Sequence, residues 1–178
     1  MSMREIQSHV ETTFAGLIGL DFLNAQDSCG DGPDEELRLG DANVPAAAST
    51  VELEDLMGEP VVQASLGAHA ARCIFNIGAQ FGYDLNEQLT ESDVPDGRID
   101  DFNPIFGAIE SLAWRVEVGL GTARFTERVG LLPRSASEIL KVFAMDAVIG
   151  CSWIPSRTIW YQPTLRRIAI SSSPRELP

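Results

Sequence analysis

The sequence has 178 residues, with 26 acidic and 13 basic side chains, and its formal net charge at pH 7 is −13. This length is typical of one domain that builds an apolar core without disulfides or metal. Hydrophobic residues make up 44% of the chain and charged residues 22%, which excludes a disordered or low-complexity protein. The composition therefore predicts a folded, soluble protein.

The acidic residues are concentrated in the first part of the chain. Residues 1–101 hold 20 acids and 4 bases, which gives −16, and residues 102–178 hold 6 acids and 9 bases, which gives +3. A negative field repels phosphate, so we expect neither nucleic acid nor an anionic membrane as a partner. If the two parts occupy different faces, the resulting charge dipole favours self-association or a basic protein partner.

The cysteines and the N-terminal residues indicate the compartment. Cys29, Cys73 and Cys151 are widely spaced and odd in number, which favours neither a disulfide framework nor a zinc site. The first residues have no apolar run behind Arg4, and no stretch reaches the roughly 18 apolar residues of a membrane span. We therefore expect a cytoplasmic protein with no signal peptide, no transmembrane segment and no cofactor.

Apolar residues at helical spacing predict about five helices. The clearest pattern is a stripe at steps of three and four residues, which predicts a long helix with Pro60 in its first turn. The stripe consists of Leu66, Ala70, Cys73, Ile74, Ile77 and Phe81. The predicted helices cover residues 3–20, 49–57, 60–81, 103–115 and 135–150. Three of them begin with a Ser followed three residues later by Glu, as in a capping box: Ser2 with Glu5, Ser49 with Glu52, and Ser135 with Glu138.

Short extended segments are predicted at 37–39, 116–120 and 158–170. Leu37, Arg38 and Leu39 alternate as the residues of a short edge strand do. The predicted fold is therefore mainly α, a single domain of about five helices. An α+β fold with a small antiparallel sheet is the alternative. In domain terms, we expect a helical domain over 1–155 and an extended C-terminal segment or arm over 156–178.

His69 and Cys73 are one candidate for chemistry. Four residues apart on the predicted helix, their side chains would face the same side. A nucleophile and base, or two metal ligands, need a third group, and the sequence contains no recognisable one. The favoured interpretation is a packed Cys beside a partly buried His.

The acidic loop at 91–101 contains weak candidates for a magnesium site, namely Asp93, Asp96, Asp100 and Asp101. Mg²⁺ binds one or two carboxylates and keeps several waters. No phosphate-binding loop, dinucleotide fingerprint, H-E-x-x-H or G-x-S-x-G motif accompanies them. We therefore expect a solvated loop, and neither a metal, a small-molecule ligand nor a catalytic function is favoured.

The C-terminal third combines aromatic and arginine side chains. Both types are enriched in protein interfaces, where they bury large areas. The candidate interface consists of Trp153, Arg157, Trp160, Tyr161, Arg166 and Arg167. The alternative is a C-terminal hairpin that completes the protein's own core.

These observations predict a non-catalytic structural or assembly subunit that acts through protein–protein contacts, in a homo- or hetero-oligomer. An acidic face against a basic face is a heterologous contact, which forms rings or filaments. Two alternatives remain. One is a small helical enzyme that uses Mg²⁺ at the acidic loop, or His69 with Cys73. The other is an acidic inhibitor or chaperone of a basic protein.

Overall fold

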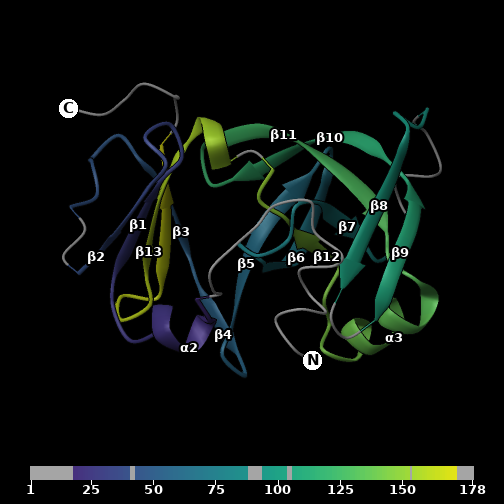
Figure 1. Ribbon diagram of the computed structural model, residues 1–178, viewed down its shortest axis with the longest axis horizontal. Coiled ribbons are helices and arrows are strands. Elements are labelled where there is room, and N and C mark those ends of the chain that lie inside the picture. The colour runs from purple at the N-terminus through teal and green to yellow at the C-terminus, as the bar shows by residue number, and fades with distance from the viewer. Residues whose placement is uncertain (1–17, 41–42, 88–93, 104–105, 153, 172–178) are drawn as a thin grey trace.

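The computed structural model describes residues 18–40, 43–87, 94–103, 106–152 and 154–171. Among these residues 51% lie in strands and 11% in helices. The prediction of a mainly α fold is therefore wrong, and so is the alternative of an α+β fold with a small antiparallel sheet. The described chain forms a five-stranded sheet, a closed six-stranded barrel and a separate hairpin (Figure 1).

The five-stranded sheet, here sheet A, is antiparallel throughout, with the order β2-β1-β13-β14-β3. It stands at the left in Figure 1, where purple N-terminal strands lie beside the yellow C-terminal ones. The strands are β1 (Ser28–Asp31), β2 (Glu36–Leu39), β3 (Ser49–Glu52), β13 (Thr158–Gln162) and β14 (Arg167–Ile170). A short helix, α2 (Leu20–Leu23), precedes β1.

The barrel follows the order β10-β11-β7-β12-β6-β5, and pairing of β10 with β5 closes it. Two of its pairs, β11 with β7 and β12 with β6, are parallel. A seventh strand, β4 (Glu54–Leu56), extends β5 beyond the closed ring. The barrel strands are β5 (Glu59–Leu66), β6 (His69–Phe75), β7 (Gly82–Asp84), β10 (Trp114–Leu120), β11 (Ala123–Leu131) and β12 (Ala147–Ile149).

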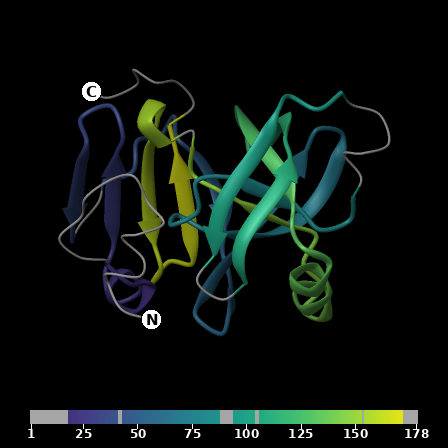
Figure 2. The ribbon, with the colours of Figure 1, turned by 45° about the vertical axis from the view of Figure 1, so that its right-hand side comes forward.

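The hairpin of β8 (Arg98–Asn103) and β9 (Gly107–Leu112) and the helix α3 (Arg134–Val142) lie on the side of the barrel away from sheet A (Figures 1 and 2). One core cluster joins inward-facing barrel residues to Ile159, Ile168 and Ile170 of sheet A. A second cluster joins the barrel's outer face to Ile99 and Ile109 of the hairpin, with Leu140 of α3 packed against it. The barrel is therefore the middle layer.

The long helix predicted over 60–81 is replaced by β5, β6 and the segment that leads to β7. Leu66 pairs with His69 across a two-residue turn, in which Gly67 has φ +57. A two-residue turn with Gly at a positive φ is a typical hairpin connection. Cys73, Ile74 and Phe75 of β6 are all buried, because strands covered on both faces lose the alternation that marks a strand.

Of the other predicted helices, two are replaced by strands, one is present but shorter, and one lies mostly outside the described residues. The segment 49–57 forms β3 and β4, and the segment 103–115 includes β9 and the first residues of β10. The helix predicted over 135–150 exists as α3 but ends at Val142, after which β12 enters the barrel. Pro133, and not Ser135, is its N-cap residue. The predicted first helix, 3–20, lies mostly outside the described residues.

Each predicted extended segment contains a strand. β2 spans the 37–39 triplet, β10 includes 116–120, and β13 and β14 fall within 158–170. The predicted domain boundary at residue 155 falls in the 3-10 turn η2 (Ile154–Ser156), directly before β13. β13 then pairs with β1, and β14 with β3, so the two ends of the described chain share one sheet.

Because of this pairing, the acidic first part of the chain and the basic second part do not form separate units of the fold. Sheet A and the barrel each contain strands from both sides of residue 101. The two parts of the chain are therefore interleaved within both sheets among the described residues. Any charge complementarity has to be sought locally.

Candidate interaction surface

Strand β2 forms one edge of sheet A and, among the described residues, pairs only with β1. Figures 1 and 2 both show it at the outer end of the sheet. All four of its residues, Glu36–Leu39, are exposed. An edge strand presents backbone N–H and C=O groups that can pair with another chain. β2 is therefore a place where sheet A can be extended.

The two leucines of β2 lie on the apolar face of sheet A. Leu37 is opposite Gly30, which is opposite Ile159, and side chains of opposed residues point to the same face. Ile159 belongs to the core cluster shared with the barrel. Leu37 is nevertheless 48% exposed and Leu39 46% exposed, so the apolar face of the sheet continues past the part that the barrel covers.

Gly30 leaves space next to Leu37. A Cβ atom added at Gly30 would meet no heavy atom within 4 Å among the described residues. We call the set of Gly30 and Glu36–Leu39 the β2 edge surface. It combines a strand edge that is unpaired within the described ranges with two exposed leucines.

The opposite face of β2 is polar and held in place. Arg38 donates to Asp31 Oδ2 at 3.1 Å and to Glu36 Oε2 at 3.1 Å. The Asp31 side chain is fully buried, and its Oδ1 accepts a hydrogen bond from Thr158 Oγ1 at 3.4 Å. These contacts link β2, β1 and β13. Glu36 adds a charge to the exposed acids of the preceding turn, Asp34 and Glu35.

A second exposed apolar group lies at the end of α3. Ile139 is 52% exposed, Val142 80% and Phe143 40%. This group has no strand edge beside it, because it ends a helix. Its backbone is already bonded to the barrel, since Phe143 O accepts a hydrogen bond from Arg72 at 2.8 Å.

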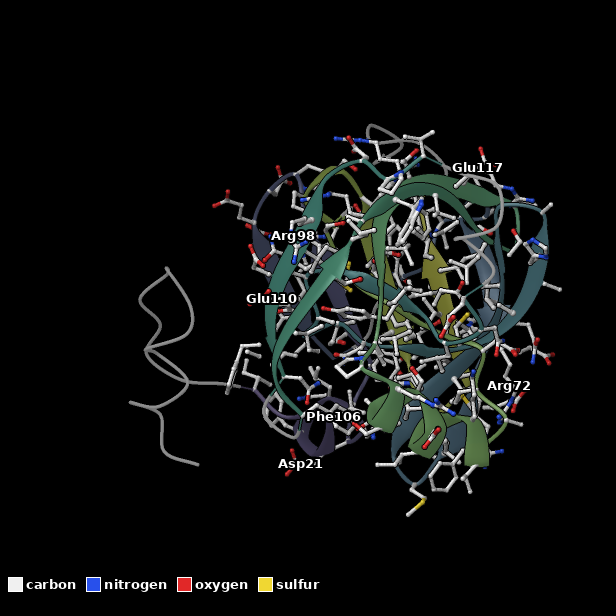
Figure 3. All side chains as sticks on the ribbon, turned by 90° about the vertical axis from the view of Figure 1, so that its right-hand side faces the viewer. Asp21, Arg72, Arg98, Phe106, Glu110 and Glu117 are labelled. Carbon is white, nitrogen blue, oxygen red and sulfur yellow. The ribbon has the colours of Figure 1, made fainter. Side chains whose placement is uncertain are left out.

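A hollow of about 450 Å³ lies between the β5–β6 hairpin and the end of α3, and Figure 3 shows Arg72 beside this helix. Its polar groups are bonded largely to one another. Asp146 accepts from the Arg72 backbone N and from Asn86 Nδ2, each at 2.9 Å. The Arg72 guanidinium pairs with Glu54 at 2.7 Å. These bonds connect β4, β6 and the segment after α3, which is a structural role.

Inside the barrel, Glu127 is a buried carboxyl group. It lies on β11 between the inward-facing Phe125 and Val129, and it is 1% exposed. Its Oε1 accepts a hydrogen bond from Gly150 N at 2.7 Å, and its Oε2 has no partner among the described residues. Burial raises the pKa of Glu127 to about 8, and the Gly150 hydrogen bond opposes that shift.

His69 and Cys73 do not form a site. Both lie on β6, where four residues span about 13 Å. His69 is exposed at the turn, whereas Cys73 is fully buried in the barrel core. Burial is also the main reason that the pKa of Cys73 rises to about 12. The interpretation of Cys73 as a packed core residue is confirmed, whereas the expectation that His69 is partly buried beside it is wrong.

The acidic candidates are dispersed. Asp96 pairs with Arg115, and Asp101 accepts a hydrogen bond from the Tyr83 hydroxyl at 2.5 Å. Asp100 lies on β8 opposite Glu110, and Asp93 lies outside the described residues. Within the described ranges, no group of three or more His, Cys, Asp or Glu side chains could hold a metal ion. The arrangement therefore gives no support to a magnesium site.

The residues of the predicted aromatic and arginine interface differ in how deeply they are buried. Trp160 is 3% exposed and packs with Cys29 and Ala169 on the outer face of sheet A. The Tyr161 hydroxyl donates to Asn24 Oδ1. Arg157 donates to the backbone oxygens of Ser171 and Arg124.

The two remaining described members lie near the β13–β14 turn. Arg167 bonds to Gln162 at 2.6 Å, whereas Arg166 is exposed in the turn itself. Trp153 lies outside the described residues. As an interface this set stays a prediction. Its alternative, a C-terminal hairpin that completes the protein's own core, is confirmed by β13 and β14.

Comparison with known proteins adds no family. No protein-family model matches the chain, and no curated protein matches it either. Neither α2 nor α3, the two α-helices of the described residues, has the length and apolar character needed to cross a membrane.

Proposed function

We propose that the protein is a non-catalytic assembly subunit that acts through protein–protein contacts, with the β2 edge surface as its contact site. The observation that carries this proposal is the combination of a strand edge that no other described strand covers with the exposed leucines at 37 and 39. Partners that add a strand gain affinity from main-chain hydrogen bonds and specificity from alternate side chains. β2 offers both.

The dispersed acidic side chains support the same proposal. A catalytic metal site needs ligands held together by rigid elements, and Asp96, Asp100 and Asp101 point to separate partners or positions. An acidic inhibitor or chaperone of a basic protein is the second candidate. It is favoured by Asp34, Glu35 and Glu36, whose exposed carboxylates adjoin the same edge.

A leucine substitution tests the proposal. Leu37→Lys with Leu39→Lys places charge on the apolar face of the β2 edge surface. Leu112→Lys with Leu165→Lys is the matched control, because Leu112 is 46% and Leu165 56% exposed elsewhere on the molecule. Sedimentation of the full chain at low and high ionic strength, with and without extract from its source, measures association. Circular dichroism checks that both variants fold.

We expect the wild type and the control variant to associate, either with further copies of the chain or with a protein from the extract. The edge variant, with Leu37→Lys and Leu39→Lys, should lose that association. A wild-type chain that sediments as a monomer in every condition would exclude the assembly proposal. An edge variant that associates as well as the control would show that the contact lies elsewhere on the molecule.

A further inference from the structure

We propose that the occupant of the β2 edge surface is a second copy of this chain, paired antiparallel with β2 so that Leu37 of one copy lies opposite Leu37 of the other. This inference rests on the proposed function and adds the identity of the partner and the register. The two copies of sheet A would then form one continuous ten-stranded sheet.

Symmetry restricts the register of such a pair. In an antiparallel pair related by a two-fold axis, the axis passes through the sheet, and opposed side chains point to the same face. A residue must therefore lie opposite its own copy. Four registers centre on a residue of β2, and they place Glu36, Leu37, Arg38 or Leu39 on the axis. With Leu39 on the axis no other residue of β2 lies opposite the second β2 and no charge pair forms between the two strands, which leaves three registers.

Charge selects one of the three registers. With Leu37 on the axis, Glu36 of each copy lies opposite Arg38 of the other, so two opposite-charge pairs form. With Glu36 on the axis two carboxylates are opposed, and with Arg38 on the axis two guanidinium groups are opposed. Directly opposed like charges destabilise a strand pair, whereas opposite charges stabilise it.

The side chains of β2 are available for this pairing. The Arg38 side chain is 53% exposed and the Glu36 side chain 58% exposed. Arg38 uses its Nε and Nη2 atoms within its own chain, which leaves the Nη1 hydrogens for Glu36 of the second copy. Arg38 can keep its contact with the buried Asp31 in both states.

The apolar face adds contact area on the other side. Leu37 meets its copy across the axis, and Leu39 flanks the pair on the same face. The paired segment has only four residues per copy, so the interface is small, and small interfaces belong to weak or transient complexes. We therefore expect a dimer whose population rises with protein concentration.

Cysteine substitution tests both the partner and the register. In the proposed pair the Cα atoms at position 37 lie about 4.5–5.5 Å apart, which is within the range for a disulfide. The Cα atoms at position 39 are offset by four residues along the strand, about 13 Å, which is too far. Leu37→Cys should therefore give a cross-linked dimer under mild oxidation, and Leu39→Cys should not.

The native thiols give a low background, because Cys29 and Cys73 are buried and Cys151 is partly buried. The wild type is the control for them. When Arg38 lies on the axis, residue 37 of one copy is opposite residue 39 of the other. The Leu37 register would therefore be overturned if Leu37→Cys and Leu39→Cys chains cross-link only when they are mixed, and neither variant cross-links alone.

A charge substitution tests the same register without cysteine. In Glu36→Arg the new guanidinium group of each copy lies opposite Arg38 of the other copy, so two like-charge pairs replace the two opposite-charge pairs. The contact between Arg38 and Asp31 stays intact. We expect the dimer dissociation constant to rise by about tenfold or more. Glu110→Arg is the matched control, because Glu110 also lies on a strand in an exposed ion pair, with Arg98. Figure 3 shows these two residues together on the β8–β9 hairpin.

The outcomes separate this inference from the proposed function. If Leu37→Cys fails to cross-link while a different protein associates with the wild type and not with the double lysine variant, the partner is not a second copy and the proposed function stands. A monomer without any protein partner overturns both. An unchanged dimer in Glu36→Arg overturns the register.

Discussion

Glu127 of β11 and Gly150, directly after β12, meet at one end of the barrel, where Glu127 Oε1 accepts a hydrogen bond from Gly150 N at 2.7 Å. The absence of a side chain at Gly150 makes this contact fit. A Cβ atom there would lie 2.8 Å from the same carboxylate oxygen and 2.4 Å from the backbone of Phe81. Two distant segments are thus fitted around a buried acid.

The buried acid predicts a specific pH dependence of stability. The pKa of Glu127 is about 8 in the folded protein and about 4.3 in an unfolded chain. Below the lower value both states are protonated. Between the two values only the unfolded chain releases its proton, so the free energy of unfolding falls as pH rises, by about 1.4 kcal/mol per pH unit from this group.

Glu127→Gln removes this contribution and keeps an oxygen for Gly150 N. Urea unfolding of both proteins between pH 5 and pH 8 measures the difference between their free energies of unfolding. We expect the variant to gain stability over the wild type steadily across this range. A difference that is constant with pH would mean that Glu127 ionises in the folded protein as it does in the unfolded chain.

Two glycine substitutions should differ sharply. Gly150→Ala drives a Cβ atom into Phe81 and Glu127, and overpacking of this kind costs about 1–3 kcal/mol or more. Gly30→Ala adds a Cβ atom in open space, so its effect should stay within about 0.5 kcal/mol. Thermal unfolding of both variants provides the comparison, and equal losses would contradict the packing around Glu127.

The interaction surface was predictable in part from the sequence. Leu37, Arg38 and Leu39 alternate between polar turn segments, and this local pattern correctly predicts an edge strand. It does not predict which strand lies beside it. The proximity of β2 to Ile159 depends on the pairing of β1 with β13, a contact between residues more than 120 positions apart that no local pattern reports.

The helix error has a physical cause in the barrel. Over 60–81 the apolar residues of the stripe belong to two strands of opposite direction and to the segment entering β7, and their spacing matches a helix by coincidence. Ala70 and Ile77, which a helix would bury with the others, are exposed. The turn at Gly67 was the available signal, because Gly commonly occupies hairpin turns of this type. A second two-residue turn lies at Met57 and Gly58, and both of these residues have positive φ. The sequence suggested the end of a helix at this point.

The site residues show the same limit. Trp160 and Arg157 have the composition of an interface, yet Trp160 is buried in the protein's own sheet. Glu127 was missed because a single acid in a strand resembles a solvent-facing residue. The signal that could have found it is its phase, since it shares the alternation of Ala123, Phe125 and Val129.

Ser49 should be a stabilising link between sheet A and the barrel. Its hydroxyl donates to Leu120 O at 2.8 Å and accepts from Thr122 N at 2.7 Å and Ala123 N at 3.1 Å. Ser49→Ala leaves these groups unsatisfied, so we expect a loss of about 2–3 kcal/mol in the free energy of unfolding. Ser135→Ala, at an exposed position of α3, is the control, and a similar loss in both would contradict this role.

Thiol reactivity should report the integrity of the barrel core. Burial raises the pKa of Cys73 to about 12 and also raises the pKa of Cys151, whose thiol donates to Asn76 O. Cys29 is 3% exposed and its pKa is raised as well, chiefly by burial. Because the thiolate is the reactive form, we expect the folded protein to react slowly with a chromogenic disulfide reagent at pH 8.

Unfolding in urea should expose all three thiols to rapid reaction at the same pH. Glu127→Gln refines the test, because the Glu127 carboxylate adds to the shifts at Cys73 and Cys151 but is not among the causes for Cys29. At pH 9 Glu127 is ionised in the wild type, so Cys73 and Cys151 should react faster in the variant than in the wild type. Rapid labelling of Cys73 in the folded wild type would contradict its place in the core.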